Sequence, residues 1–170
     1  MKVSKIVKDE HKMVIKSSEE MADLAAEIAA KSEVGDVVAL KGTLGAGKSF
    51  FAKSFINALR EKLGEKPCEV LSPTFNLVYS YDTKKGEVFH FDLYRLKSAD
   101  ELENIGFFDA LKNGICLIEW PEIAADFLKK NCQKNLLEIE IKIREDLGEE
   151  GREVLIFSSL CHSRVGGNPF

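Results

Sequence analysis

The sequence predicts an α/β fold: a three-layer sandwich in which helices cover a mixed sheet with a parallel core and additional antiparallel strands. Three features predict it. Helical patterns alternate with short apolar strands, a glycine-rich turn stands directly between one strand and the next helix, and the last two strand patterns alternate apolar and polar residues. Such an order of elements is typical of α/β domains.

Length and composition agree with one domain of this kind. The chain has 170 residues, of which 45% are hydrophobic, and this is enough for a single core. We expect residues 1–159 to form the domain. Residues 160–170 contain turn-forming residues without periodicity, and we expect them to be a disordered tail.

Charge and cysteine usage limit the possible partners and compartments. The net charge of -4 excludes a global positive field that would draw the protein onto nucleic acid, so RNA contact would be local or made through a partner. The N-terminus is charged where a secretory signal needs an apolar segment, and the four cysteines form no CxxC pair. No apolar run approaches the roughly 18 residues of a membrane span. We expect a cytoplasmic protein that does not enter the membrane.

The first half of the chain predicts a helix, a strand, a loop and a second helix. Apolar residues at helical spacing follow a capping box of Ser17 and Glu20, and this helix should end near Gly35. The β-branched run DVVALKG at residues 36–42 predicts a short strand that glycine stops. From Lys48 the period is helical again, with one apolar face formed by Ala52, Phe55, Ile56, Leu59 and Leu63.

The middle of the chain predicts three strands. A short strand should end at Leu71 before a Ser-Pro break, and two alternating strands should follow, joined by a turn at residues 82–86. Side chains alternate across the second of these two strands. Phe89, Phe91 and Leu93 should face one side, and His90, Asp92 and Tyr94 should face the other.

The remaining elements are short helices and strands. Residues 98–106 predict a capped helical turn and residues 107–114 a short helix. Residues 115–119 predict a buried strand that ends on Glu119, and Pro121 begins another helix. Residues 136–143 and 152–159 predict a final antiparallel pair at the edge of the sheet, with one face exposed to water.

The segment from Gly42 to Ser49 fits the motif G-x-x-x-x-G-K-[ST], and it lies between a predicted strand and a predicted helix, as the motif requires. Glycines let successive backbone N–H groups turn inward around an anion, and the start of the helix adds the positive end of its dipole. Lys48 would reach the β- and γ-phosphates of a nucleotide, and the Ser49 hydroxyl would bind Mg²⁺. The motif predicts a P-loop NTPase-like fold.

Such a site also needs an acidic residue near the end of a neighbouring strand, to hold Mg²⁺ directly or through water. Glu119 and Asp92 are both candidates, since each closes a predicted strand. Thr74 lies on a loop where a threonine can sense the γ-phosphate, although it could equally satisfy backbone groups after Pro73.

Three further residues allow more than one interpretation. Core packing is the default for Trp120, with stacking on a base or a partner as the minority interpretation. His90 is better explained as a hydrogen-bonded sheet residue than as a metal ligand, because no His/Cys cluster accompanies it. Arg95 could bind phosphate, carboxylate or RNA, and its spacing does not decide among them.

Several segments occur in the order in which a known family has them: GDVVALKGTLGAGKSFFAKSF, SPTFNLVYSY, HFDLYRL, ELENIGFFDAL and ICLIEWPE. Together they resemble the bacterial TsaE family, the small P-loop ATPases of tRNA threonylcarbamoyladenosine biosynthesis, over about residues 17–122. The resemblance implies a protein that binds ATP with Mg²⁺, hydrolyses it slowly and works with the TsaB and TsaD proteins. The modified base is the tRNA adenosine next to the anticodon, and contact with tRNA would be indirect or through the complex.

The resemblance also implies roles for individual residues. Glu119 would be the second protein ligand of the metal beside Ser49, Asp92 would orient water or support the site, and Thr74 would take the switch-like position. Thr43 stands where the family usually has an acidic residue, which removes a negative charge beside the phosphates. The family's phosphate loop corresponds to Leu44, Gly45, Ala46, Gly47, Lys48 and Ser49.

Two other functions remain open at the level of sequence. A small-molecule P-loop kinase would need an acceptor pocket and usually a basic lid, and no arginine-rich lid segment is visible. A nucleotide-dependent binding module would bind ATP with negligible turnover. A GTPase is disfavoured because the chain contains no N-K-x-D segment.

Overall fold

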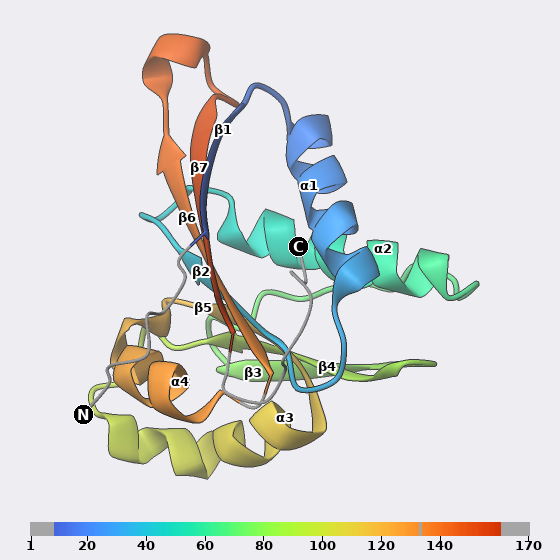
Figure 1. Ribbon diagram of the computed structural model, residues 1–170, viewed down its shortest axis with the longest axis vertical. Helices are drawn as coiled ribbons and strands as arrows, with labels where there is room; N and C mark the ends of the chain where they lie inside the picture. The colour runs from blue at the N-terminus through green and yellow to red at the C-terminus, as the bar shows by residue number, and fades with distance from the viewer. Residues whose placement is uncertain (1–8, 133, 161–170) are drawn as a thin grey trace.

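A computed structural model, shown in Figure 1, describes residues 9–132 and 134–160. Its centre is a seven-stranded sheet in the order β1-β7-β6-β2-β5-β4-β3. The strands are β1 (Asp9–Ile15), β2 (Val37–Lys41), β3 (Val78–Thr83), β4 (Gly86–Asp92), β5 (Gly114–Glu119), β6 (Asn135–Ile143) and β7 (Arg152–Leu160).

Strand directions confirm the expected mixed sheet. β2 pairs in parallel with both β5 and β6, and β4 pairs in parallel with β5. β3 is antiparallel to β4, β7 to β6, and β1 to β7. The carboxyl ends of the four parallel strands therefore meet at one edge of the sheet, where ligands bind in such folds.

Helices cover both faces of the sheet (Figure 1). α1 (Ser18–Lys31) and α2 (Lys48–Lys62) lie on one face and enclose a core that includes Phe51 and Phe55. The other face carries the 3₁₀ helices η1 (Ala99–Ile105) and η2 (Pro121–Ala124) with α3 (Phe107–Asn113) and α4 (Ala125–Asn131). These elements enclose a second core around Phe91 and Phe107, whose ring centroids lie 5.2 Å apart. A third 3₁₀ turn, η3 (Glu145–Leu147), lies between β6 and β7.

The start of α1 follows the expected capping pattern in part. The N–H of Glu20 donates to the Ser17 hydroxyl at 3.2 Å, as in a capping box. The Glu20 carboxylate, however, accepts from the N–H of Lys16 at 2.7 Å. The helix ends at Lys31 rather than near Gly35, and Gly35, with φ of 95°, belongs to the turn into β2.

Two features at the margins of the sheet differ from the expectations. No strand forms at residues 69–71, because the N–H groups of Cys68 and Leu71 donate to the side chains of Asn57 and Tyr81 instead of a neighbouring strand. β1 was not predicted at all. It pairs along β7, so β1 and not the final pair forms that edge of the sheet.

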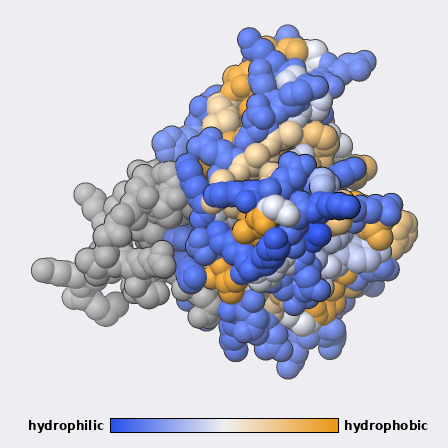
Figure 2. All heavy atoms as spheres, turned by 90° about the vertical axis from the view of Figure 1, so that its right-hand side faces the viewer, coloured by the Kyte–Doolittle hydropathy of each residue, from blue (hydrophilic) through white to orange (hydrophobic). Residues whose placement is uncertain are grey.

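β7 extends to Leu160, and residues 161–170 of the expected tail lie outside the described residues. None of the helices within residues 9–132 and 134–160 is both long and apolar enough to span a bilayer. Figure 2 views the molecule from the side of α1 and α2, where hydrophilic residues predominate with smaller hydrophobic areas between them.

Candidate phosphate-binding site

The loop between β2 and α2 depends on three glycines. A Cβ on Gly42 would lie 2.5 Å from the carbonyl oxygen of Ile141, so only glycine lets the loop leave β2 this close to β6. Gly45 and Gly47 have φ of 78° and 111°, in the left-handed region that glycine adopts without strain. Alternation of such conformations turns backbone N–H groups toward a common centre.

Gly47 is also the N-cap residue of α2, and no side chain caps the helix there. The first N–H groups of a helix have no partner within it, and they form an anion site together with the helix dipole. The first turn of α2 contains no acidic residue that would compete with an anion. The loop and the helix start therefore form a cradle suited to phosphate.

Lys48 is the first residue of α2 and is only 4% exposed. Its Nζ donates to the carbonyl oxygens of Gly42 and Thr43, each at 2.8 Å, and lies 4.0 Å from the ring centroid of Trp120. Burial lowers the pKa of Lys48, and the nearby negative charges of Glu119 and Asp92 oppose this shift. The ammonium group thus lies at the loop with neutral hydrogen-bond partners.

Glu119 joins α2 to the sheet. Its Oε2 accepts from the Ser49 hydroxyl at 3.0 Å, and its Oε1 lies 2.8 Å from His90 Nε2. His90 Nε2 therefore donates to this carboxylate. His90 Nδ1 is buried without a hydrogen-bond partner in the described part of the chain. His90 is accordingly a hydrogen-bonded sheet residue that orients Glu119.

Asp92 lies beside Glu119, because the parallel register of β4 and β5 pairs these two residues. Its Oδ2 accepts from the Thr74 hydroxyl at 3.2 Å, and its Oδ1 accepts from the N–H of Tyr94 at 2.9 Å. The Thr74 hydroxyl is also 2.9 Å from that of Ser72. Among the described residues, the Thr74 hydroxyl therefore contacts Asp92 and Ser72 rather than the backbone after Pro73.

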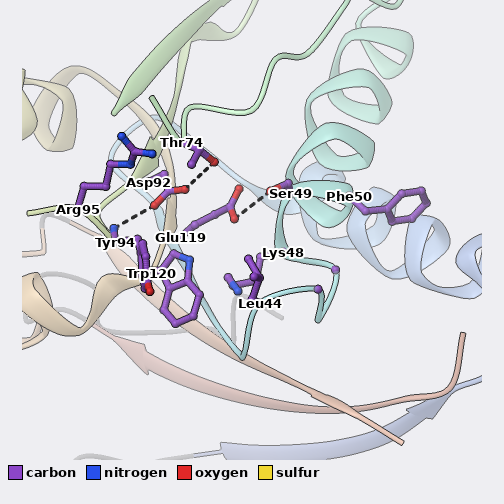
Figure 3. Close-up of a pocket in the computed structure, with 12 residues that line it drawn as sticks. Leu44, Lys48, Ser49, Phe50, Thr74, Asp92, Tyr94, Arg95, Glu119 and Trp120 are labelled. Atoms are coloured by element: carbon purple, nitrogen blue, oxygen red, sulfur yellow. Dashed lines mark hydrogen bonds between the residues drawn. The ribbon is translucent and has the colours of Figure 1, made fainter. Parts of the chain in front are cut away.

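These groups surround one open cavity of about 360 Å³ at the carboxyl edge of the sheet (Figure 3). Its lining consists of Leu44, Gly45, Gly47, Lys48, Ser49, Phe50, Thr74, Asp92, Tyr94, Arg95, Glu119 and Trp120. Of the residues expected in the phosphate loop, Ala46 alone does not line this cavity, and it is fully buried.

Trp120 does not pack in the core, so the default interpretation of this residue was wrong. It is only partly buried, and its ring lies 4.8 Å from that of Tyr94. Its φ of 54° is unusual for a residue with a side chain. This conformation turns the chain sharply after β5 and keeps the ring beside Lys48.

Sequence reasoning did not assign Phe50 and Tyr94 to the site. For Phe50, which directly follows Ser49, adjacency to the motif is the signal that could have found it. For Tyr94, the signal is the strand alternation that places it on the same face as Asp92. Arg95 is exposed and lines the cavity, with its guanidinium 4.4 Å from the ring centroid of Phe75.

The site fits a magnesium ion that is bound together with a phosphate ligand. The described residues contain no group of three or more His, Cys, Asp or Glu side chains that could hold a metal by themselves. The adjacent Ser49 hydroxyl and Glu119 carboxylate offer two oxygen donors. Mg²⁺ prefers such oxygen ligands and usually completes its shell with water and substrate phosphates.

A parallel-cored α/β sheet with this loop, lysine and strand-end acidic residues defines a P-loop nucleotide-binding protein. Residues 15–154 match the family model of the threonylcarbamoyl adenosine biosynthesis protein TsaE. The chain belongs to the TsaE family and is an accessory protein of this tRNA modification.

Individual relatives agree with this assignment. The chain is 41% identical over 145 residues to TsaE of Aquifex aeolicus, covering 85% of this chain and 94% of that one. It is 37% identical over 134 residues to TsaE of Rickettsia felis, covering 79% and 74% of the two chains. The crystal structure of Bacillus subtilis YdiB superposes with a TM-score of 0.64 at 28% identity, over 91% of this chain and 88% of YdiB.

Proposed function

We propose that the chain is a Mg²⁺-dependent ATPase that acts with TsaB and TsaD in threonylcarbamoyl modification of the tRNA adenosine next to the anticodon. The observation that carries this proposal is the 3.0 Å hydrogen bond between Ser49 and Glu119 beside the glycine loop. It brings the two oxygen donors expected of a P-loop magnesium site together at the start of α2.

In this proposal the backbone of residues 44–49 holds the phosphates, and Lys48 moves its hydrogen bonds from the loop carbonyls to β- and γ-phosphate oxygens. Ser49 and Glu119 hold Mg²⁺, which when bound neutralises phosphate charge. Water attacks the γ-phosphorus as the bond to the ADP oxygen breaks, and Asp92 or Glu119 orients that water by accepting its hydrogen bond.

We also propose that TsaD docks at the mouth of this cavity. Leu44, Phe75 and Tyr94 are 88%, 78% and 65% exposed, and Leu44 and Tyr94 line the cavity. Exposed apolar and aromatic side chains that gather at one place are typical of protein-binding surfaces. Contact with tRNA would then be made through the complex, which agrees with the net charge of -4.

Phosphate release should be measured with ATP and with GTP, each with and without TsaB, TsaD and tRNA. We expect release from ATP that increases when the partners are present. Lys48→Ala should abolish it, whereas Lys53→Ala, on an exposed part of the same helix, should not.

Three outcomes of this experiment would contradict the proposal. ATP binding without release in any mixture would identify a binding module. Release from GTP alone would overturn the choice of nucleotide. A phosphorylated small molecule in place of free phosphate would indicate a kinase.

A further inference from the structure

We propose that Arg152 is a positioning residue of the phosphate loop. Its side chain holds the loop carbonyls on the side of β7, so that the Gly47 N–H points to the opposite side, where phosphate would bind. This inference rests on the proposed nucleotide binding and extends it to a residue outside the recognised motifs. Arg152 is separated from the loop by 106 positions in sequence, as counted from Ala46.

The backbone of Arg152 is held by the sheet and by the turn before it. Arg152 is the first residue of β7 and pairs with Ile15 of β1 and Ile143 of β6. The preceding residue, Gly151, accepts a hydrogen bond from the N–H of Arg144 at 2.9 Å. The guanidinium therefore projects toward the loop from a strand that is paired on both sides.

The guanidinium donates only to main-chain carbonyl groups in the contacts that the structure describes. Its Nε donates to Ala46 at 2.8 Å, and its Nη2 donates to Gly45 at 3.4 Å. Its Nη1 donates to Glu149 and Gly151 at 2.8 and 2.9 Å. One planar group thus connects the start of β7 with two successive carbonyls of the phosphate loop.

Peptide geometry transmits this contact to the other side of the loop. The carbonyl of one residue and the N–H of the next belong to one rigid plane and point in opposite directions. Holding the Ala46 carbonyl on the side of β7 therefore directs the Gly47 N–H away from β7. The Ala46 N–H is already used, since it donates to Thr43 at 3.1 Å, so the Gly47 N–H is the group that Arg152 orients.

Charge adds to this effect. Among the described residues no carboxylate lies within 4.0 Å of the Arg152 guanidinium, whereas Arg144 in the same hairpin is paired with Asp146 and Glu153. Glu150, two positions before Arg152, accepts from the N–H of Ser18 instead. Within residues 9–132 and 134–160 the positive charge behind the loop is therefore not part of an ion pair, and it favours an anion in front of the loop.

The test compares Arg152→Lys, Arg152→Ala and the control Arg144→Ala in the full-length chain. Lysine keeps the charge, but its ammonium lacks the planar array of donors that reaches both carbonyls. ATP binding is followed by the fluorescence of Trp120, the only tryptophan, which lines the cavity. Thermal unfolding of each variant reports the fold, and the amide NMR signal of Gly47 without nucleotide reports the loop.

We expect both Arg152 variants to bind ATP at least about tenfold more weakly than the wild type. This is the size of effect expected when hydrogen bonds from a charged group, here the Arg152 guanidinium, are lost. Arg144→Ala should bind normally. The Gly47 signal should shift in Arg152→Lys and stay in place in Arg144→Ala.

Wild-type affinity of Arg152→Lys would mean that charge alone matters and would overturn the positioning role, as would an unchanged Gly47 signal. If the wild type itself does not bind ATP, the proposed function fails. The Gly47 signal then decides separately whether Arg152 orients the loop.

Discussion

At the scale of single residues, burial of the Lys48 ammonium group in the site opposes folding. Its ammonium is almost fully buried and is held by two carbonyls and the face of Trp120. Burial lowers its pKa, which means that folding disfavours the charged form. Perturbed groups of this kind cluster at functional sites.

Replacing Lys48 by methionine tests this cost. Lys48→Met keeps an unbranched chain and removes the buried charge, so thermal stability at neutral pH should be equal to or higher than that of the wild type. ATP affinity should fall by about a hundredfold, because charge-assisted hydrogen bonds to phosphate are lost. Lys53→Met is the control for both measurements.

The stability difference between Lys48→Met and the wild type should shrink as pH rises. The folded-state pKa of Lys48 lies below its unfolded value, so the penalty is complete below the folded pKa and is relieved as pH rises through it. A difference that grows with pH would show that the sign of the shift is wrong.

Glu119→Gln separates metal binding from nucleotide binding. Glutamine can still accept from Ser49 but carries no negative charge for Mg²⁺. We expect ATP affinity without Mg²⁺ to stay near the wild-type value and the gain from added Mg²⁺ to disappear, measured by titration with and without the metal. Glu122→Gln, on the exposed start of η2, should keep that gain. Full Mg²⁺ dependence in Glu119→Gln would exclude Glu119 as a ligand.

At the scale of elements, the Glu153 carboxylate on β7 connects this strand with the edge strand β1 and with Arg144, directly after β6. Glu153 Oε2 lies 2.8 Å from Lys12 Nζ and 3.0 Å from Arg144 Nη1. The hydrogen bond from Lys12, with the charges of Lys12 and Arg144, lowers the pKa of Glu153. A carboxyl whose pKa is lowered by folding stabilises the native state above its unfolded pKa and loses this effect as pH falls through the folded one.

Glu153→Gln should therefore be less stable than the wild type at neutral pH, by the small amount that is typical of surface ion pairs. The difference should begin to shrink on acidification below the unfolded glutamate pKa of about 4.3 and vanish once the pH is below the lowered folded pKa. Denaturant unfolding at a series of pH values measures it. Glu149→Gln, an exposed neighbour, is the control, and a pH-independent difference would contradict the assigned ion pairs.

At the scale of the whole molecule, the two cores on opposite faces of the sheet share the same strands. Phe55 and Phe91 are both fully buried, one in each core. Phe91 precedes Asp92 on β4, so the second core also supports the strand end that carries part of the site. Because β2, β4 and β5 contribute to both cores, we expect one cooperative unit.

Phe55→Ala and Phe91→Ala should each lower the free energy of unfolding by roughly 3–5 kcal/mol. Both variants should still unfold in one transition, with coincident changes in circular dichroism and Trp120 fluorescence. Two separate transitions in either variant would show that the layers on the two faces fold independently.

Local patterns predicted the central elements because their signals are strong within short windows. The glycine loop with Lys48 and Ser49 lies between β2 and α2 as expected, and β5 ends on Glu119. β1 was missed because its sequence DEHKMVI contains mostly charged and polar residues, and its pairing partner lies in β7. The strand expected before Leu71 is absent because side chains of α2 and β3 take the N–H groups that a neighbouring strand would need.

The sequence alone determined the strand–loop–helix order of β2 and α2, the phosphate loop between them and the set of acidic and hydroxyl residues proposed for the site, since these depend on spacing along the chain. Tertiary structure decided which of those side chains touch. The parallel register places Asp92 beside Glu119, the turn at Trp120 keeps its ring next to Lys48, and β7 brings Arg152 to the loop. Contacts of this kind depend on strand register and on paired segments far apart in sequence, which no local pattern encodes.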